Sequence, residues 1–109
     1  MLESLRLLGR NGSPSGACPA LYEAGPDVFL IVGWLTDTVA TVEIPHGLLG
    51  FAEHDRFIGA PLTDTGRGTF ILKGEPVTDQ ETIAVLALEG NETAVVVPRC
   101  KRTYFGAAA

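Results

Sequence analysis

The stretch Val28-Phe29-Leu30-Ile31-Val32-Gly33-Trp34-Leu35 decides the fold of this chain. It is rich in β-branched and aromatic residues, a Gly-Pro turn precedes it, and Thr36-Asp37 follows it, which are the signals of a strand between two turns. Residues 20–23 form a second strand-like run before the first turn. Residues 39–44 form a third after the second turn and stop at Pro45, which lacks a backbone donor. We therefore predict a strand, a turn and two further strands.

The second half of the chain repeats this order. Residues 61–64 precede a turn at 65–68, residues 69–74 form the next strand, and residues 94–97 form the closing strand before Pro98. The matched positions are Leu21 with Leu62, Glu23 with Asp64, Gly25 with Gly66, Phe29 with Phe70, Gly33 with Gly74, Asp37 with Asp79, and Pro45 with Pro98. We interpret this as a duplicated unit. The alternative is two ordinary hairpins that share residues because turns demand them.

An insertion distinguishes the second copy from the first. It spans residues 80–90, and its apolar residues Ile83, Ala84, Leu86 and Ala87 recur at helical spacing. Asp79 is suited to begin a helix, and Gly90-Asn91 is suited to end it. We thus predict a mainly β (α+β) fold of two tandem, antiparallel strand-turn-strand-strand units, with one helix inserted before the last strand.

The length of 109 residues predicts a single domain, residues 1–109. Within it we place unit one at about 18–46, a linker at 47–59 and unit two at about 60–100. The opening leucines, Leu2, Leu5, Leu7 and Leu8, fit neither periodicity cleanly, so a short helix and an edge strand both remain open.

Composition bounds the compartment and the partners. No apolar run approaches the roughly 20 residues needed to cross a bilayer, and the N-terminus lacks a signal peptide's apolar centre. We expect a cytoplasmic protein without membrane contact, in which Cys18 and Cys100 are reduced thiols; a single bridge between them is the alternative. The formal charge of −5 argues against direct nucleic-acid binding. We interpret the basic cluster of Arg99, Lys101 and Arg102 as the solvated end of a strand.

The two copies differ in the polarity of their central strand. In the second copy one face is polar, as in a sheet with one wet side. In the first copy both faces are apolar, and the additional apolar face carries Val28, Leu30, Val32 and Trp34. These four are the candidate partner-binding residues. An apolar face of this size has to be covered, and the candidates are the inserted helix, the N-terminal leucines and another subunit. If another subunit covers it, Trp34 is the expected anchor.

No motif predicts a catalytic or cofactor site. The available metal ligands, Cys18, His46, His54 and Cys100, match no finger or ribbon spacing. Asp27, Asp37, Asp64 and Asp79 sit in turns, where carboxylates accept hydrogen bonds from nearby backbone. Gly66-Arg67-Gly68 is too short for a phosphate-binding loop and is interpreted as a hairpin turn. We predict no catalytic residue, no metal ligand and no cofactor.

Five segments resemble a recurring segment of small actinobacterial regulatory proteins of the BldB type. They are Gly68-Thr69-Phe70-Ile71-Leu72-Lys73-Gly74, Val77-Thr78-Asp79, residues 92–98, Cys18-Pro19-Ala20-Leu21-Tyr22, and Val32-Gly33-Trp34. The resemblance implies a non-enzymatic regulator of development or secondary metabolism that acts as a dimer with a helix-turn-helix partner. The family segment typically occurs once per chain, whereas here it occurs twice, so a fused pair would replace the dimer by an internal pseudo-dimer.

Three function classes follow. The first is a regulatory protein-binding module that engages itself or a DNA-binding regulator. The second is a small-molecule or metal-binding domain that uses His46 and His54 with Cys100. The third is a small enzyme whose catalytic groups, carboxylates or a Cys-His pair, assemble only in space.

Overall fold

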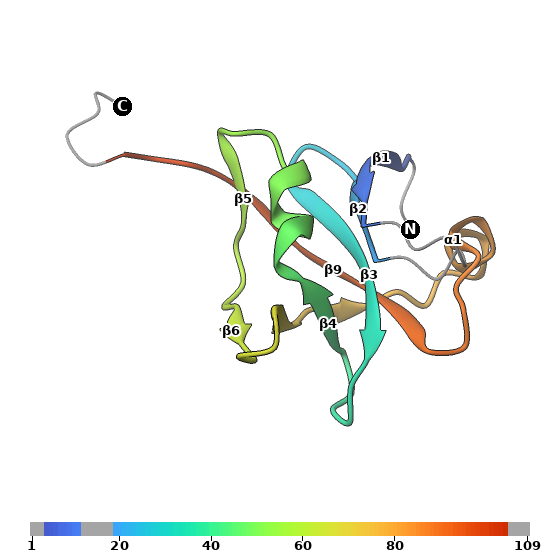
Figure 1. The fold of residues 1–109 in the computed structure, drawn as a ribbon. Helices are drawn as coiled ribbons and strands as arrows, with labels where there is room; N and C mark the ends of the chain where they lie inside the picture. The colour runs from blue at the N-terminus through green and yellow to red at the C-terminus, as the bar shows by residue number, and fades with distance from the viewer. Residues whose placement is uncertain (1–3, 12–18, 105–109) are drawn as a thin grey trace.

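The computed structural model describes residues 4–11 and 19–104, and these form a mainly β fold (Figure 1). The elements in chain order are β1 (Arg6–Arg10), β2 (Ala20–Glu23), β3 (Val28–Leu35), β4 (Thr41–Pro45), the 3-10 helix η1 (His46–Phe51), β5 (Arg56–Ile58), β6 (Thr63–Asp64), β7 (Thr69–Lys73), β8 (Glu75–Pro76), α1 (Gln80–Leu86) and β9 (Glu92–Lys101). All strand pairs are antiparallel, and one helix precedes the last strand. The predicted fold class is confirmed.

Strand β3 is the centre of the sheet. One of its edges pairs with β2 and then, at Trp34 and Leu35, with β4. The other edge pairs with β9 along the whole length from Val28 to Trp34. Strand β1 extends the sheet beyond β2, and β7 and β6 extend it beyond β4. The long apolar run is therefore covered by strands on both edges.

The two units exchange their strands. The central strand of unit one, β3, pairs with β9 of unit two, and the central strand of unit two, β7, pairs with β4 of unit one. After Gly74 the chain continues from β7 into β8, which pairs with β9. The sheet therefore folds back on itself: β7 pairs with β4, and its continuation β8 pairs with β9, which in turn pairs with β3.

The pairing register repeats between the units. Strand β3 meets β4 through the pairs Trp34 with Glu43 and Leu35 with Val42. Strand β8 meets β9 through the matching pairs Glu75 with Val96 and Pro76 with Val95. The match of Gly33 with Gly74 places Trp34 and Leu35 opposite Glu75 and Pro76 in the repeat. The match of Pro45 with Pro98 likewise places Glu43 and Val42 opposite Val96 and Val95. The residues matched in the sequence repeat therefore also pair in the same register.

Gly33 and Gly74 each lie close to the backbone of a neighbouring strand. A Cβ atom at Gly33 would lie 2.8 Å from the carbonyl oxygen of Glu43, and one at Gly74 would lie 2.6 Å from the carbonyl oxygen of Val96. Real Cβ atoms do not approach backbone oxygens so closely. The matched glycines are therefore needed for the same reason in each unit.

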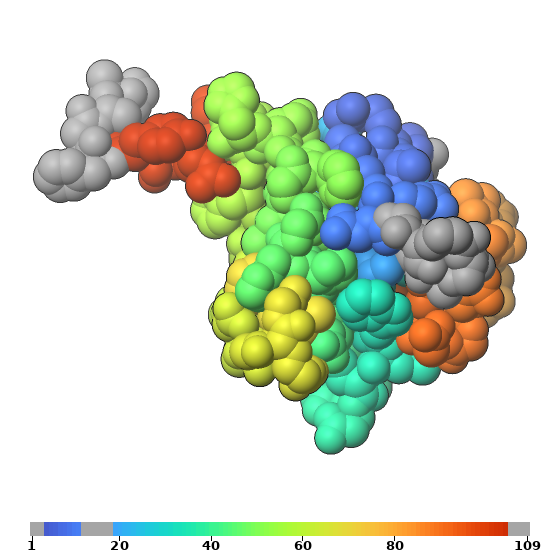
Figure 2. Space-filling view, viewed as in Figure 1, coloured from blue at the N-terminus to red at the C-terminus, as the bar shows by residue number. Residues whose placement is uncertain are grey.

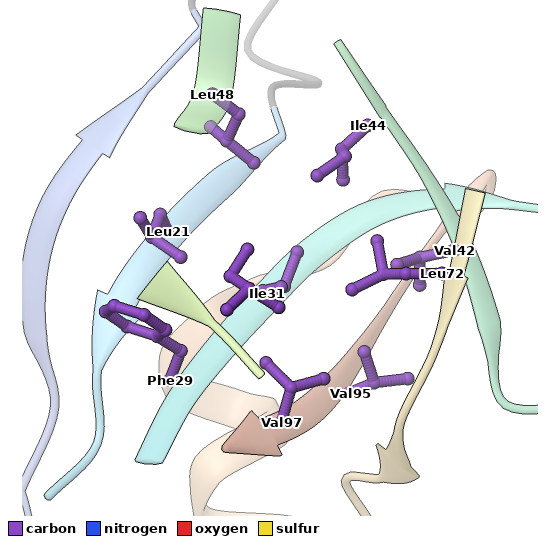
Figure 3. Packing of buried hydrophobic residues seen from close by; sticks show 10 residues of the cluster. Leu21, Phe29, Ile31, Val42, Ile44, Leu48, Leu72, Val95 and Val97 are labelled. Carbon is purple, nitrogen blue, oxygen red and sulfur yellow. The ribbon is translucent and has the colours of Figure 1, made fainter. Parts of the chain in front are cut away.

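The main core lies on one face of β3 and draws on both units (Figure 3). Phe29 and Ile31 are fully buried there beside Leu48 of η1. The remaining buried members are Leu21, Val42, Ile44, Ile58, Leu72, Val95 and Val97. Because β-branched residues fit a pleated, half-buried surface, these strands are suited to form this core.

A second, smaller cluster covers the opposite face of β3. Leu30 and Val32 are buried there with Ala20, Ala24 and Ala94. Partly buried side chains pack against them from the N-terminal segment, β2, β3, the residues around α1, and β9: Leu5, Tyr22, Val28, Val77, Leu86, Leu88 and Val96. The additional apolar face is thus covered inside the chain, by the inserted helix and an N-terminal leucine.

Several boundaries differ from the predicted ones. Strand β4 begins at Thr41, because Ala40 has a positive φ of 61° and belongs to the turn. Helix α1 ends at Leu86, before the predicted Gly90-Asn91, because the next residue, Ala87, adopts a left-handed conformation. Strand β9 does not stop at Pro98. It continues to Lys101 because the carbonyl oxygen of Pro98 accepts a hydrogen bond from Gly59 and the next residue donates to Asp27.

The predicted linker, residues 47–59, carries structure of its own. It contains most of η1 and the whole of β5, which pairs with the end of β9. The ambiguous N-terminal segment contains the edge strand β1, and Leu2 lies outside the described residues. Neither helix in the described part of the chain is long and apolar enough to cross a membrane.

Candidate functional site

The structure divides the four predicted partner-binding residues into two pairs. Leu30 is fully buried and Val32 is 4% exposed, both within the second cluster. They cannot touch a partner in this conformation, so the predicted four-residue docking face has to be corrected. Val28 and Trp34, at the two ends of β3, are half-buried and can still be reached.

A projecting tip with two exposed apolar side chains lies at the end of β3 that carries Trp34. We define the tip as Leu35 and the turn formed by residues 36–40; it projects from the body at the lower end of the molecule (Figures 1 and 2). Leu35 is 54% exposed and Val39 is 83% exposed. Trp34 and Leu35 point to opposite faces of the strand, so this end of β3 is apolar on both faces.

Hydrogen bonds hold the tip in one conformation. The Thr36 hydroxyl accepts from the Thr38 amide at 3.1 Å and donates to the Thr38 carbonyl at 3.0 Å. The Gly74 amide donates to the carbonyl of Ala40 at 3.0 Å, which ties the turn to the second unit. Val39 therefore lies on a hydrogen-bonded turn.

A shallow groove of about 230 Å³ runs along the tip. The tip forms one of its walls. The other wall is formed by Pro76 of β8 and by residues 93–95 of β9. A side chain from another molecule that contacts Val39 would lie next to this groove.

Arg99 is buried and hydrogen-bonded, so its interpretation as part of a solvated strand end is wrong. Its side chain is 6% exposed and donates to Glu53 at 2.8 Å and to the Pro26 carbonyl at 2.7 Å. The guanidinium also lies 5.7 Å from the ring centre of Phe29. The hydrogen bond between Arg99 and Glu53 lowers the pKa of Glu53 and raises the pKa of Arg99. Lys101 and Arg102 are exposed, as expected.

A second polar network joins the units at β4 and β7. The Glu43 carboxylate accepts from the Thr69 hydroxyl at 2.6 Å and from Arg67 at 2.9 Å. The hydrogen bond from Thr69, followed by that from Arg67 and its charge, lowers the pKa of Glu43. Both partners belong to the second unit, so the contact stabilises the exchange of strands.

The structure does not bring the described candidate metal ligands together. Within residues 4–11 and 19–104, no three His, Cys, Asp or Glu side chains are grouped to hold a metal ion. His46 faces Asp64 at 3.3 Å and packs on Phe70, while Cys100 lies beside Gly59. His46, His54 and Cys100 therefore do not form a three-ligand metal group among the described residues. Cys18 lies outside the described residues.

Two of the turn carboxylates perform the predicted backbone duty. Asp79 accepts from the Thr82 amide at the start of α1. Asp64 accepts from the amide of Gly66, whose φ of 79° places it in a hairpin turn with Gly68. These contacts give the two groups a structural role.

Two features were not found from the sequence. Val39 was placed inside a strand, and only its neighbours Thr38 and Ala40, unremarkable as residue types, could have signalled the turn. The burial of Arg99 depends on Glu53 and Pro26, which are distant in sequence, and no local signal reports it.

Comparisons with protein-family models, curated proteins and solved structures find no significant match to the chain.

Proposed function

We propose that the chain is a non-enzymatic regulatory module that acts in the cytoplasm and binds a partner protein through the tip. The observation that carries the proposal is the exposure of Val39 on a turn that hydrogen bonds hold in place. A loop already fixed in its bound shape loses little conformational entropy when it docks. Trp34 adds a large aromatic side chain at the base of the tip.

The regulatory role comes from the resemblance to BldB-type proteins. The partner that this resemblance implies is a helix-turn-helix protein. Such proteins carry basic surfaces for DNA, and the charge of −5 on this chain is complementary to them. A second copy of the chain is the alternative partner, and measurement of the mass in solution distinguishes the two.

Affinity capture from the source cells tests the proposal with three forms of the chain: wild type, Val39→Glu and Val85→Glu. Val85 is a matched control because it is 73% exposed on α1, away from the tip. A captured DNA-binding regulator, identified by mass spectrometry, should be lost with Val39→Glu and kept with Val85→Glu.

The solution mass of the same three proteins tests the homodimer. If wild type is a dimer, Val39→Glu should be a monomer and Val85→Glu a dimer. Trp34→Glu, checked by circular dichroism for folding, should behave like Val39→Glu. Three monomers that capture the same proteins would contradict the proposal.

A further inference from the structure

Glu92, at the start of β9, holds a buried carboxylate that is only half satisfied. The residue is 8% exposed, and its Oε1 atom accepts a hydrogen bond from the Glu89 amide at 3.0 Å. Its Oε2 atom is buried and has no hydrogen-bond partner among the described residues. Because an unpaired buried carboxylate oxygen is costly, this site calls for a donor.

The Glu92 side chain lines a pocket of about 230 Å³ between β2, β3 and the end of α1. Ala20, Val32, Leu86 and Ala87 form its aliphatic lining, and Tyr22 lines it as well. Val32 lines this pocket as well as packing in the second cluster. An apolar cavity of about 150 Å³ holds a benzene molecule, so this pocket has room for a ligand of about six to eight heavy atoms.

The charges around the pocket favour a cation. Glu89 and Glu92 line it with two carboxylates, and Arg10 contributes one positive charge. Arg10 forms no ion pair with any described residue, and its contact with the Tyr22 hydroxyl is long, at 3.4 Å. The formal balance of these lining side chains is thus one negative charge.

We propose that this pocket binds a small primary alkylammonium ion, with the ammonium group on the Glu92 carboxylate and the alkyl chain along Val32 and Leu86. The terminal torsion of a glutamate is soft, so a small rotation presents the unpaired oxygen to the pocket. An ammonium group supplies three donors and the charge that the carboxylate lacks. The pocket shares no lining residue with the groove along the tip.

Titration of the ¹⁵N-labelled protein with n-pentylammonium, followed by amide chemical shifts, tests the proposal. Pentan-1-ol is the neutral probe of the same shape. The ammonium ion should shift the amides of Glu89 and Glu92 and saturate with a Kd of about a millimolar, as expected for a ligand of this size. The alcohol should bind at least about tenfold more weakly, because it lacks the charge-assisted hydrogen bond.

Glu92→Gln keeps the shape and removes the charge, so it should weaken pentylammonium binding at least about tenfold. Glu75→Gln removes the same charge from an exposed position on β8 and should leave binding unchanged. Arg10→Gln, at an exposed position, should tighten binding, and it keeps the test decisive if Glu92→Gln does not fold. Equal affinity for the alcohol, or no saturating shift with wild type, overturns the proposal.

Discussion

Gly33 and Gly74 set how closely the backbones cross at the two equivalent points of the sheet. The nearest backbone oxygen to an added Cβ belongs to the neighbouring strand in both cases, and a strand cannot move as a flexible side chain can. We expect Gly33→Ala and Gly74→Ala each to lower the free energy of unfolding by about 1–3 kcal/mol, as overpacking does. Urea denaturation measures this.

Gly50 provides the control for both substitutions. An added Cβ there meets nothing within 4 Å, and its φ is not positive. Gly50→Ala should change stability by less than about 1 kcal/mol. If Gly33→Ala were as mild as this control, the close crossing would be absent in solution.

Helix α1 illustrates how an element seen in the sequence acquires its role only in three dimensions. Asp79 and the apolar spacing predict its start, but from the sequence the face of β3 that Leu86 helps to cover is also compatible with cover by another subunit. Whether the helix or another subunit covers this face depends on where the exchanged strands place a helix of seven residues. Such contacts join residues far apart in sequence, and local patterns do not encode them.

The same limit explains the errors at strand ends. Residue types predicted β3 with its observed bounds, because turns flank it on both sides. Pro98 was expected to end β9, yet the ladder continues because β5 supplies a new partner beyond it. Three-residue β5 has no sequence signal of its own and forms only because β9 is present.

The cap of α1 yields a prediction at the scale of the element. The Asp79 carboxylate accepts from the Thr82 amide and from the Thr82 hydroxyl, at 3.2 Å and 2.6 Å. Asp79→Ala should lower the free energy of unfolding by about 1 kcal/mol, since it leaves a helix amide unsatisfied. Asp79→Ser can still accept and should recover most of the loss. Equal destabilisation by both variants, measured in urea, would contradict a capping role.

At the scale of the whole molecule, the two units are held together by exchanged strands and by two ion networks that bridge distant segments. Glu43 of unit one binds Thr69 and Arg67 of unit two. Arg99 of unit two binds Glu53 of the predicted linker and, at 3.6 Å, Glu23 of unit one. Since β3 and β7 each pair with a strand of the other unit, we expect both units to unfold in a single cooperative transition.

The ion networks make the stability of the molecule depend on pH. The hydrogen bonds from Thr69 and Arg99 hold the pKa values of Glu43 and Glu53 below their ordinary range. The unfolded chain therefore binds protons first as the pH falls. The stabilisation by these two groups is complete above the unfolded pKa of about 4.3 and is lost as the pH falls through the lower, folded values.

Urea denaturation at pH 7, 5, 4 and 3 measures this dependence in wild type and in the double variant Glu43→Gln, Glu53→Gln. The variant should be less stable at pH 7, because glutamine keeps the shape but loses the charge-assisted hydrogen bonds. Its stability should fall less between pH 5 and pH 3, so the two curves should approach each other in acid. A gap between them that is as large at pH 3 as at pH 7 would show that the two carboxylates stabilise the joined units by packing and not by charge.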